Sequence, residues 1–184
     1  MNKHNLFAWK RTAAAVLATG FLVVSSSAKA SDFADSEQVS KLLSEAKTLS
    51  FQLKEDAATM ESYTRVNVSW QSHAAAITQI KEHVNALERQ VTKLKNARNS
   101  ASPWQKTAID RINPFLDELG GYTSAVIEHL NGEQKQTFDK YKDYLEANAD
   151  YAADLAAMIA DFVDYGKTKQ RMERLAAKLE VPVK

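Results

Sequence analysis

The sequence predicts an all-α protein, an antiparallel four-helix bundle of the up-down type with coiled-coil-like heptads and a short C-terminal helix. From residue 36 onward, apolar residues recur at helical spacing and no segment alternates as a strand does. Short polar connections join four amphipathic segments of roughly 27–33 residues, each about 40–50 Å long as a helix. Segments of matched length can pair end to end, as helices in a bundle do.

The first two helices are expected at about 36–63 and 69–98. The second has the cleanest pattern in the chain, with apolar a and d positions at Ile77, Ile80, Val84, Leu87, Val91 and Leu94. Between the two helices, residues 64–68 have β-branched character, and Ser69 can cap the second helix. If this stretch stayed helical, the alternative fold would be a long helical hairpin that dimerises.

The third helix is expected at 103–131, because residues 102–105 (Ser-Pro-Trp-Gln) offer an N-cap serine, a proline at N1 and a glutamine at N3. Pro114 and the Gly120-Gly121 pair predict a kink or a short break within it.

The fourth helix is expected at 132–165, since Asn131 to Gln134 resembles another helix cap. Gly166 and the following Lys-Thr-Lys run interrupt its register, so a separate short basic helix is expected at 168–179.

Residues 1–30 have the pattern of a cleavable secretory signal peptide. Basic residues precede an uncharged apolar run at 13–24, and the small residues Ala28 and Ala30 form an A-x-A cleavage site. An uncleaved anchor is the alternative, but the run is shorter than the roughly 20 residues that span a bilayer. We therefore expect cleavage after Ala30, a periplasmic or secreted location, and a single domain over residues 31–184.

The charge of the whole chain hides a contrast between these two parts. The formal net charge is +1, but the first thirty residues carry four of the 24 basic residues and no acid, which leaves 20 basic against 23 acidic residues in 31–184. Nucleic-acid binding is therefore not expected. The absence of cysteine excludes a disulfide scaffold, a thiolate metal site and a cysteine nucleophile.

No catalytic motif is found, so the sequence predicts neither an enzyme nor a cofactor. It lacks a G-x-S-x-G elbow, a glycine-rich phosphate loop and an H-E-x-x-H pair. A carboxylate-bridged dimetal bundle would need a glutamate three residues before each liganding histidine. Those positions before His73, His83 and His129 hold Trp70, Ile80 and Val126, so no metal site is expected.

Two groups of residues are site candidates. An acidic surface is expected on the outer face of the fourth helix, formed by Asp139, Asp143, Glu146, Asp150, Asp154, Asp161 and Asp164. Its simplest interpretation is a solvated face that keeps the bundle soluble. A small pocket beside the kinked third helix, near Trp70, His73 and Tyr122, is the second candidate.

The tail at 167–184 has six basic and two acidic residues, with Met172, Leu175, Ala176 and Leu179 on one side. Such a segment can lie on a membrane surface or bind a partner. Because its apolar side has no aromatic residue, docking back onto the bundle is favoured.

The pentapeptide Leu130-Asn131-Gly132-Glu133-Gln134 is similar to the L-T-x-x-Q signature of small helical periplasmic chaperones of the Spy and CpxP type. Asn131 replaces the threonine, and the match covers five residues, so it does not establish membership.

Taken together, the signal-peptide pattern, the heptads and the lack of a catalytic motif predict an exported helical-bundle protein of the cell envelope. It is expected to act by protein–protein interaction or self-association, in a structural, adaptor or chaperone-like role. A periplasmic bundle that binds a small ligand or a metal is the alternative.

Overall fold

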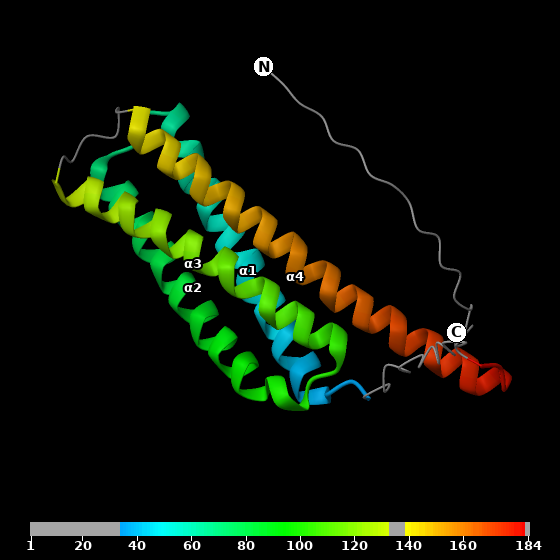
Figure 1. Cartoon of the computed structure of the whole chain (residues 1–184). Coiled ribbons are helices and arrows are strands. Elements are labelled where there is room, and N and C mark those ends of the chain that lie inside the picture. Colours follow the sequence, from blue (N-terminus) through cyan, green and yellow to red (C-terminus); the bar gives the residue numbers. More distant parts are fainter. Residues whose placement is uncertain (1–33, 133–138, 183–184) are drawn as a thin grey trace, which may run out of the picture. The chain divides into compact units, whose positions relative to one another are not determined.

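The computed structural model describes residues 34–132 and 139–182, and these form four α-helices without a strand. They are α1 (Glu37–Ser62), α2 (Trp70–Ala97), α3 (Pro103–Gly132) and α4 (Asp139–Leu179) (Figure 1). The predicted all-α four-helix bundle is confirmed.

Each helix packs against two others: α1 and α3 both contact α2 and α4. Contacts at the helix ends show the antiparallel order. The indole Nε1 of Trp70, at the start of α2, donates a hydrogen bond to the carbonyl of Leu130 at the end of α3. At the opposite end of the bundle, Ser36 before α1 bonds to Gln105 in the first turn of α3.

The core consists of the apolar stripes of all four helices. The six a and d residues predicted for α2 are all buried, with exposed fractions of 5% or less. Opposite them lie similarly buried side chains of the other helices, including Leu53, Ile112, Leu119, Leu145 and Leu155. Heptad spacing therefore identified the buried face of α2 correctly.

The connection between α1 and α2 is not helical. A short 3₁₀ turn at Tyr63–Arg65 leads to an extended Val66, and Ser69 caps α2 by accepting a hydrogen bond from the backbone N–H of Ser72 at 3.2 Å. The alternative of one long helix through this region is therefore wrong. The β-branched stretch and the capping serine end one helix and start the next.

The short break predicted in α3 is also wrong, because the helix continues through Pro114 and the Gly120-Gly121 pair. Pro114 lies on the exposed side of the helix. The carbonyl that loses its helical partner there can bond to water, which lowers the cost of the proline. Burial of Leu116 and Leu119 on the inner face keeps the glycine segment helical.

The expected boundary at residues 166–168 does not exist: α4 is one helix from Asp139 to Leu179, and the separate helix at 168–179 is part of it. Asn131 and Gly132, expected to start the fourth helix, instead end α3. The intervening residues 133–138 and the predicted signal peptide at 1–30 lie outside the described residues.

Candidate interaction surface around Trp104

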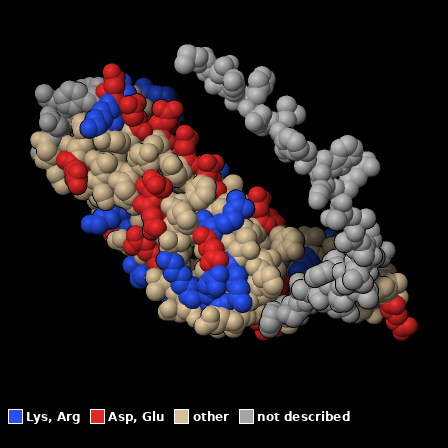
Figure 2. Space-filling model, in the orientation of Figure 1, with Lys and Arg blue, Asp and Glu red and all other residues tan. Residues whose placement is uncertain are grey.

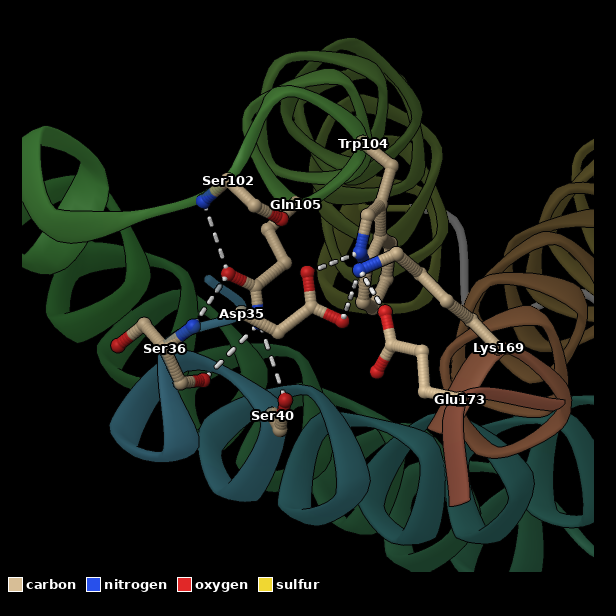
Figure 3. Close-up of polar contacts among 8 residues, drawn as sticks. All are labelled: Asp35, Ser36, Ser40, Ser102, Trp104, Gln105, Lys169 and Glu173. Carbon is tan, nitrogen blue, oxygen red and sulfur yellow. Dashed lines mark hydrogen bonds and ion pairs between the residues drawn. The ribbon is translucent and has the colours of Figure 1, made fainter. Parts of the chain in front are cut away.

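A buried glutamine joins the starts of α1 and α3. The Oε1 atom of Gln105 accepts hydrogen bonds from the backbone N–H groups of Ser36 and Ser102, each at 3.0 Å. Its Nε2 atom donates to the carbonyl of Ser36 and to the hydroxyl of Ser40, also at 3.0 Å. Gln105 is fully buried, and these four bonds satisfy its amide (Figure 3).

The sequence predicted half of this arrangement. The Gln105 side chain does accept a hydrogen bond from the backbone N–H of Ser102, as the glutamine of a capping box does. The Ser102 hydroxyl, however, is buried with no hydrogen-bond partner among the described residues, so the expected serine cap is not formed. The bonds to Ser36 and Ser40 could not be foreseen, because they join positions at least 65 residues apart in the sequence.

A second polar contact ties α4 to the same end of the bundle. Asp35 accepts a hydrogen bond from Nε1 of Trp104 at 2.6 Å and one from Nζ of Lys169 at 3.2 Å. The Asp35 side chain is only 8% exposed. Lys169 also pairs with Glu173 at 2.8 Å. The hydrogen bonds to Glu173 and Asp35 raise the pKa of Lys169, so it stays protonated in this cluster (Figure 3).

Trp104 also explains why α4 contains a glycine. A Cβ atom built on Gly166 would lie 2.7 Å from Cη2 and 3.0 Å from Cζ2 of the Trp104 indole. The ring makes an edge contact with Tyr165, with 5.4 Å between the ring centroids. Gly166 is thus a packing residue that lets α3 approach α4, and it does not interrupt the helix.

A groove of about 640 Å³ lies beside Trp104 between α3 and α4. Its apolar lining comes from Trp104, Phe115, Met158, Phe162 and Tyr165. Three charged residues also line it: Arg111, whose guanidinium lies 5.8 Å from the Phe162 ring centroid, and the acidic residues Asp154 and Asp161. The groove therefore combines aromatic surface with charges of both signs, a composition that suits a protein or ligand contact.

Beyond Lys169, α4 continues past the ends of the other three helices (Figure 1). In this extension, residues 170–179, Met172 is 54% exposed, Leu175 48% and Leu179 66%. The expectation that these side chains dock back onto the bundle is therefore wrong, although Ala176 is buried. The reason is geometric: α1 begins at Glu37 and α3 at Pro103, close to Lys169, so neither helix lies alongside the extension.

All seven residues of the predicted acidic surface are exposed on α4. Figure 2 shows acidic side chains following this helix along one side. Asp164 pairs with Lys47 of α1 at 3.2 Å, whereas Asp154 and Asp161 line the groove. Two of the seven acidic residues thus belong to the lining of the groove, and a third is in an ion pair with α1.

The structure gives the three residues of the second candidate site different surroundings. Trp70 lines a shallow pocket of about 190 Å³ with Ile127 and Leu130. Tyr122 packs against Tyr151 of α4, with 5.3 Å between the ring centroids. His73 is buried.

His73 belongs to a buried aromatic cluster at the end of the bundle opposite Trp104. Its Nδ1 atom lies 2.8 Å from the hydroxyl of Tyr141. Its ring meets that of Tyr63 edge-on, while His129 stacks on Tyr141. Burial lowers the pKa of His73 and raises that of Tyr141, so both are neutral in the folded protein near pH 7.

Among the described residues, no group of three or more histidine, aspartate or glutamate side chains is placed to hold a metal ion. None of the described helices is both long and apolar enough to cross a bilayer. No protein-family model matches the chain, and no curated protein or solved structure is significantly similar to it.

Proposed function

We propose that the protein is an exported component of the cell envelope that acts by protein–protein interaction, in a structural, adaptor or chaperone-like role, and not by catalysis. The observation that carries the proposal is the exposed apolar side of the α4 extension, which adjoins the aromatic groove. Large apolar side chains at three positions of one helix extension are costly to leave in water, and they are typical of a surface that another chain covers. Export rests on the signal-peptide pattern of residues 1–30.

The test is a pull-down from the native cell envelope with two forms of the protein. The wild type is compared with a Met172→Asp/Leu175→Asp variant, whose two changes lie on the exposed extension. We expect the wild type to retain specific partners, identified by mass spectrometry and confirmed by reciprocal pull-down, and the variant to lose them. Equal capture by both forms would refute a role for this surface.

A small-ligand function is the second candidate, favoured by the volume and aromatic lining of the groove. Native mass spectrometry of protein purified from its own host tests it. A mass above that of the polypeptide, lost when Phe162→Asp replaces an aromatic wall of the groove with a charge, would support a ligand. A bare polypeptide mass would count against a tightly held one.

A further inference from the structure

We infer that the partner of the α4 extension is a second copy of this chain, with the extension of each copy lying in the groove of the other. The inference rests on the proposed function, because it names the partner of the same surface. It follows from the spacing of the exposed apolar residues, the length of the extension and the charges that flank the two surfaces.

The exposed side of α4 carries a heptad stripe of its own. Met158, Tyr165, Met172 and Leu179 are spaced by seven residues. The position four residues before each of them holds Leu175 in the extension, but Thr168, Asp161 and Asp154 in the preceding heptads. The stripe begins at the groove, which Met158 and Tyr165 line, and continues along the extension. A seven-residue apolar repeat is the pattern with which one helix packs along another.

The two parts of this stripe are similar in length. The extension has ten residues, about 15 Å of helix, and the groove-lining part of α4, residues 154–165, has twelve, about 18 Å. In an antiparallel pairing centred near Gly166, Met172 faces Phe162 and Leu175 faces Met158 of the second copy. Because each copy supplies one extension and one groove, the contact is isologous and closes as a two-fold dimer.

The charges are complementary in the same register. The extension carries the bases Arg171, Arg174 and Lys178, while its acid Glu173 is paired with Lys169. The α4 side of the groove carries Asp154 and Asp161, and the base Arg111 lines its α3 side. The antiparallel pairing brings Arg171 beside Asp161 and Lys178 beside Asp154 of the second copy. An anionic membrane could also attract a basic amphipathic helix. Such a membrane would be repelled, however, by these two aspartates, which lie along the same stripe, so the second copy is the better match.

Sedimentation velocity at micromolar concentrations tests the association. We expect a dimer for the wild type, and an increase of about 100-fold or more in the dissociation constant for Met172→Asp/Leu175→Asp, which places four charges in the apolar contact. Val66→Asp is the matched control, since Val66 is 61% exposed at the other end of the bundle. It should leave the dimer intact. All three forms should have the same helix content by circular dichroism, because the changed residues are exposed. The two dimeric forms should melt at a higher temperature than the double variant, since association stabilises the folded state.

Cysteine pairs test the register, and the chain has no cysteine of its own. Met158→Cys/Leu175→Cys should form a disulfide-linked dimer under mild oxidation. Within one helix these positions are about 25 Å apart, too far for an internal disulfide. Leu175→Cys alone should stay unlinked, because the antiparallel pairing places the two Leu175 residues equally far apart. A linked dimer from Leu175→Cys alone would overturn the antiparallel arrangement.

Charge exchange supplies an independent check of the same register. Asp161→Arg and Arg171→Asp should each weaken the dimer, and the two together should restore it. Failure of the double variant to recover would count against the pairing.

The outcomes for the two proposals differ. A wild type that stays monomeric but captures another envelope protein through Met172 and Leu175 would overturn self-association and leave the proposed function standing. A monomer that captures nothing would refute both. A monomer that co-sediments with phosphatidylglycerol vesicles, and loses this in the Met172→Asp/Leu175→Asp variant, would overturn self-association in favour of a lipid surface.

Discussion

Replacing Gly166 with alanine tests whether Trp104 controls the packing of α4. Alanine favours a helix interior over glycine by about 1 kcal/mol. At Gly121 of α3, a new Cβ atom would meet nothing within 4 Å, so Gly121→Ala should raise the free energy of unfolding by that amount. At Gly166 the same atom would lie 2.7 Å from Cη2 of Trp104. The two substitutions are chemically identical and differ in what the new methyl group meets.

The Trp104 ring cannot move aside without loss. Its Nε1 atom is bonded to Asp35 at 2.6 Å, and its edge contacts Tyr165. Overpacking of this kind costs about 1–3 kcal/mol. After the gain in helix propensity, Gly166→Ala should be destabilising by up to ~2 kcal/mol, whereas Gly121→Ala should stabilise by ~1 kcal/mol. In a domain of this size, 1 kcal/mol corresponds to a change in Tm of about 2–4 °C.

Thermal and urea unfolding of both variants would measure these changes. A further comparison in a Trp104→Leu background isolates the contact, because there Gly166→Ala should behave as Gly121→Ala does. If Gly166→Ala raised Tm as much as Gly121→Ala in the wild-type background, the proposed role of the Trp104 contact would be refuted.

Two further predictions concern the buried polar groups. Gln105→Ala removes four hydrogen bonds at the start of α1 and α3 and should cost about 2–4 kcal/mol in urea unfolding. Thr107→Ala, an exposed change in the same helix, should alter the free energy of unfolding by no more than ~0.5 kcal/mol. An equally small effect of Gln105→Ala would contradict the stabilising role assigned to its hydrogen bonds. Burial lowers the pKa of His73 in the folded protein. As the pH falls below about 6.5, the unfolded chain therefore takes up a proton that the folded chain does not. The free energy of unfolding should then fall by up to ~1.4 kcal/mol per pH unit. His73→Gln can keep the hydrogen bond to Tyr141 without titrating, so its free energy of unfolding should depend less on pH between 7.5 and 5. If the free energy of unfolding changed equally with pH in both forms, His73 would not be the group responsible.

Features that depend on one helix alone were predictable from the sequence. The buried positions of α2, from Ile77 to Leu94, follow from their spacing, since steps of three and four residues stay on one face of a helix. Ser69 was predicted as a cap because it precedes the first apolar residue of the pattern, and it does accept the hydrogen bond from Ser72.

Features that depend on two distant segments were not predictable. Asp35 is one of two acids shortly before the first helix, and nothing in its neighbourhood in the sequence indicates that Trp104 and Lys169 bond to it. Gly166 is a more instructive case. A glycine inside a helical pattern commonly weakens or ends the helix, and only the position of the Trp104 ring shows that the helix needs it.

The α4 extension shows what periodicity measures and what it omits. An apolar stripe indicates that one side of a helix avoids water, but not which chain covers that side. In α4 the covered stripe includes Ile159 and Val163, which pack in the core. Tyr165 comes two residues after Val163 and so points away from that core, and Met172 and Leu179 follow it at intervals of seven. The exposed stripe is therefore a second apolar face of the same helix and not a continuation of the buried stripe. Since α1 and α3 both begin near Lys169, none of the described helices covers this stripe, and that is the observation from which we infer a second copy.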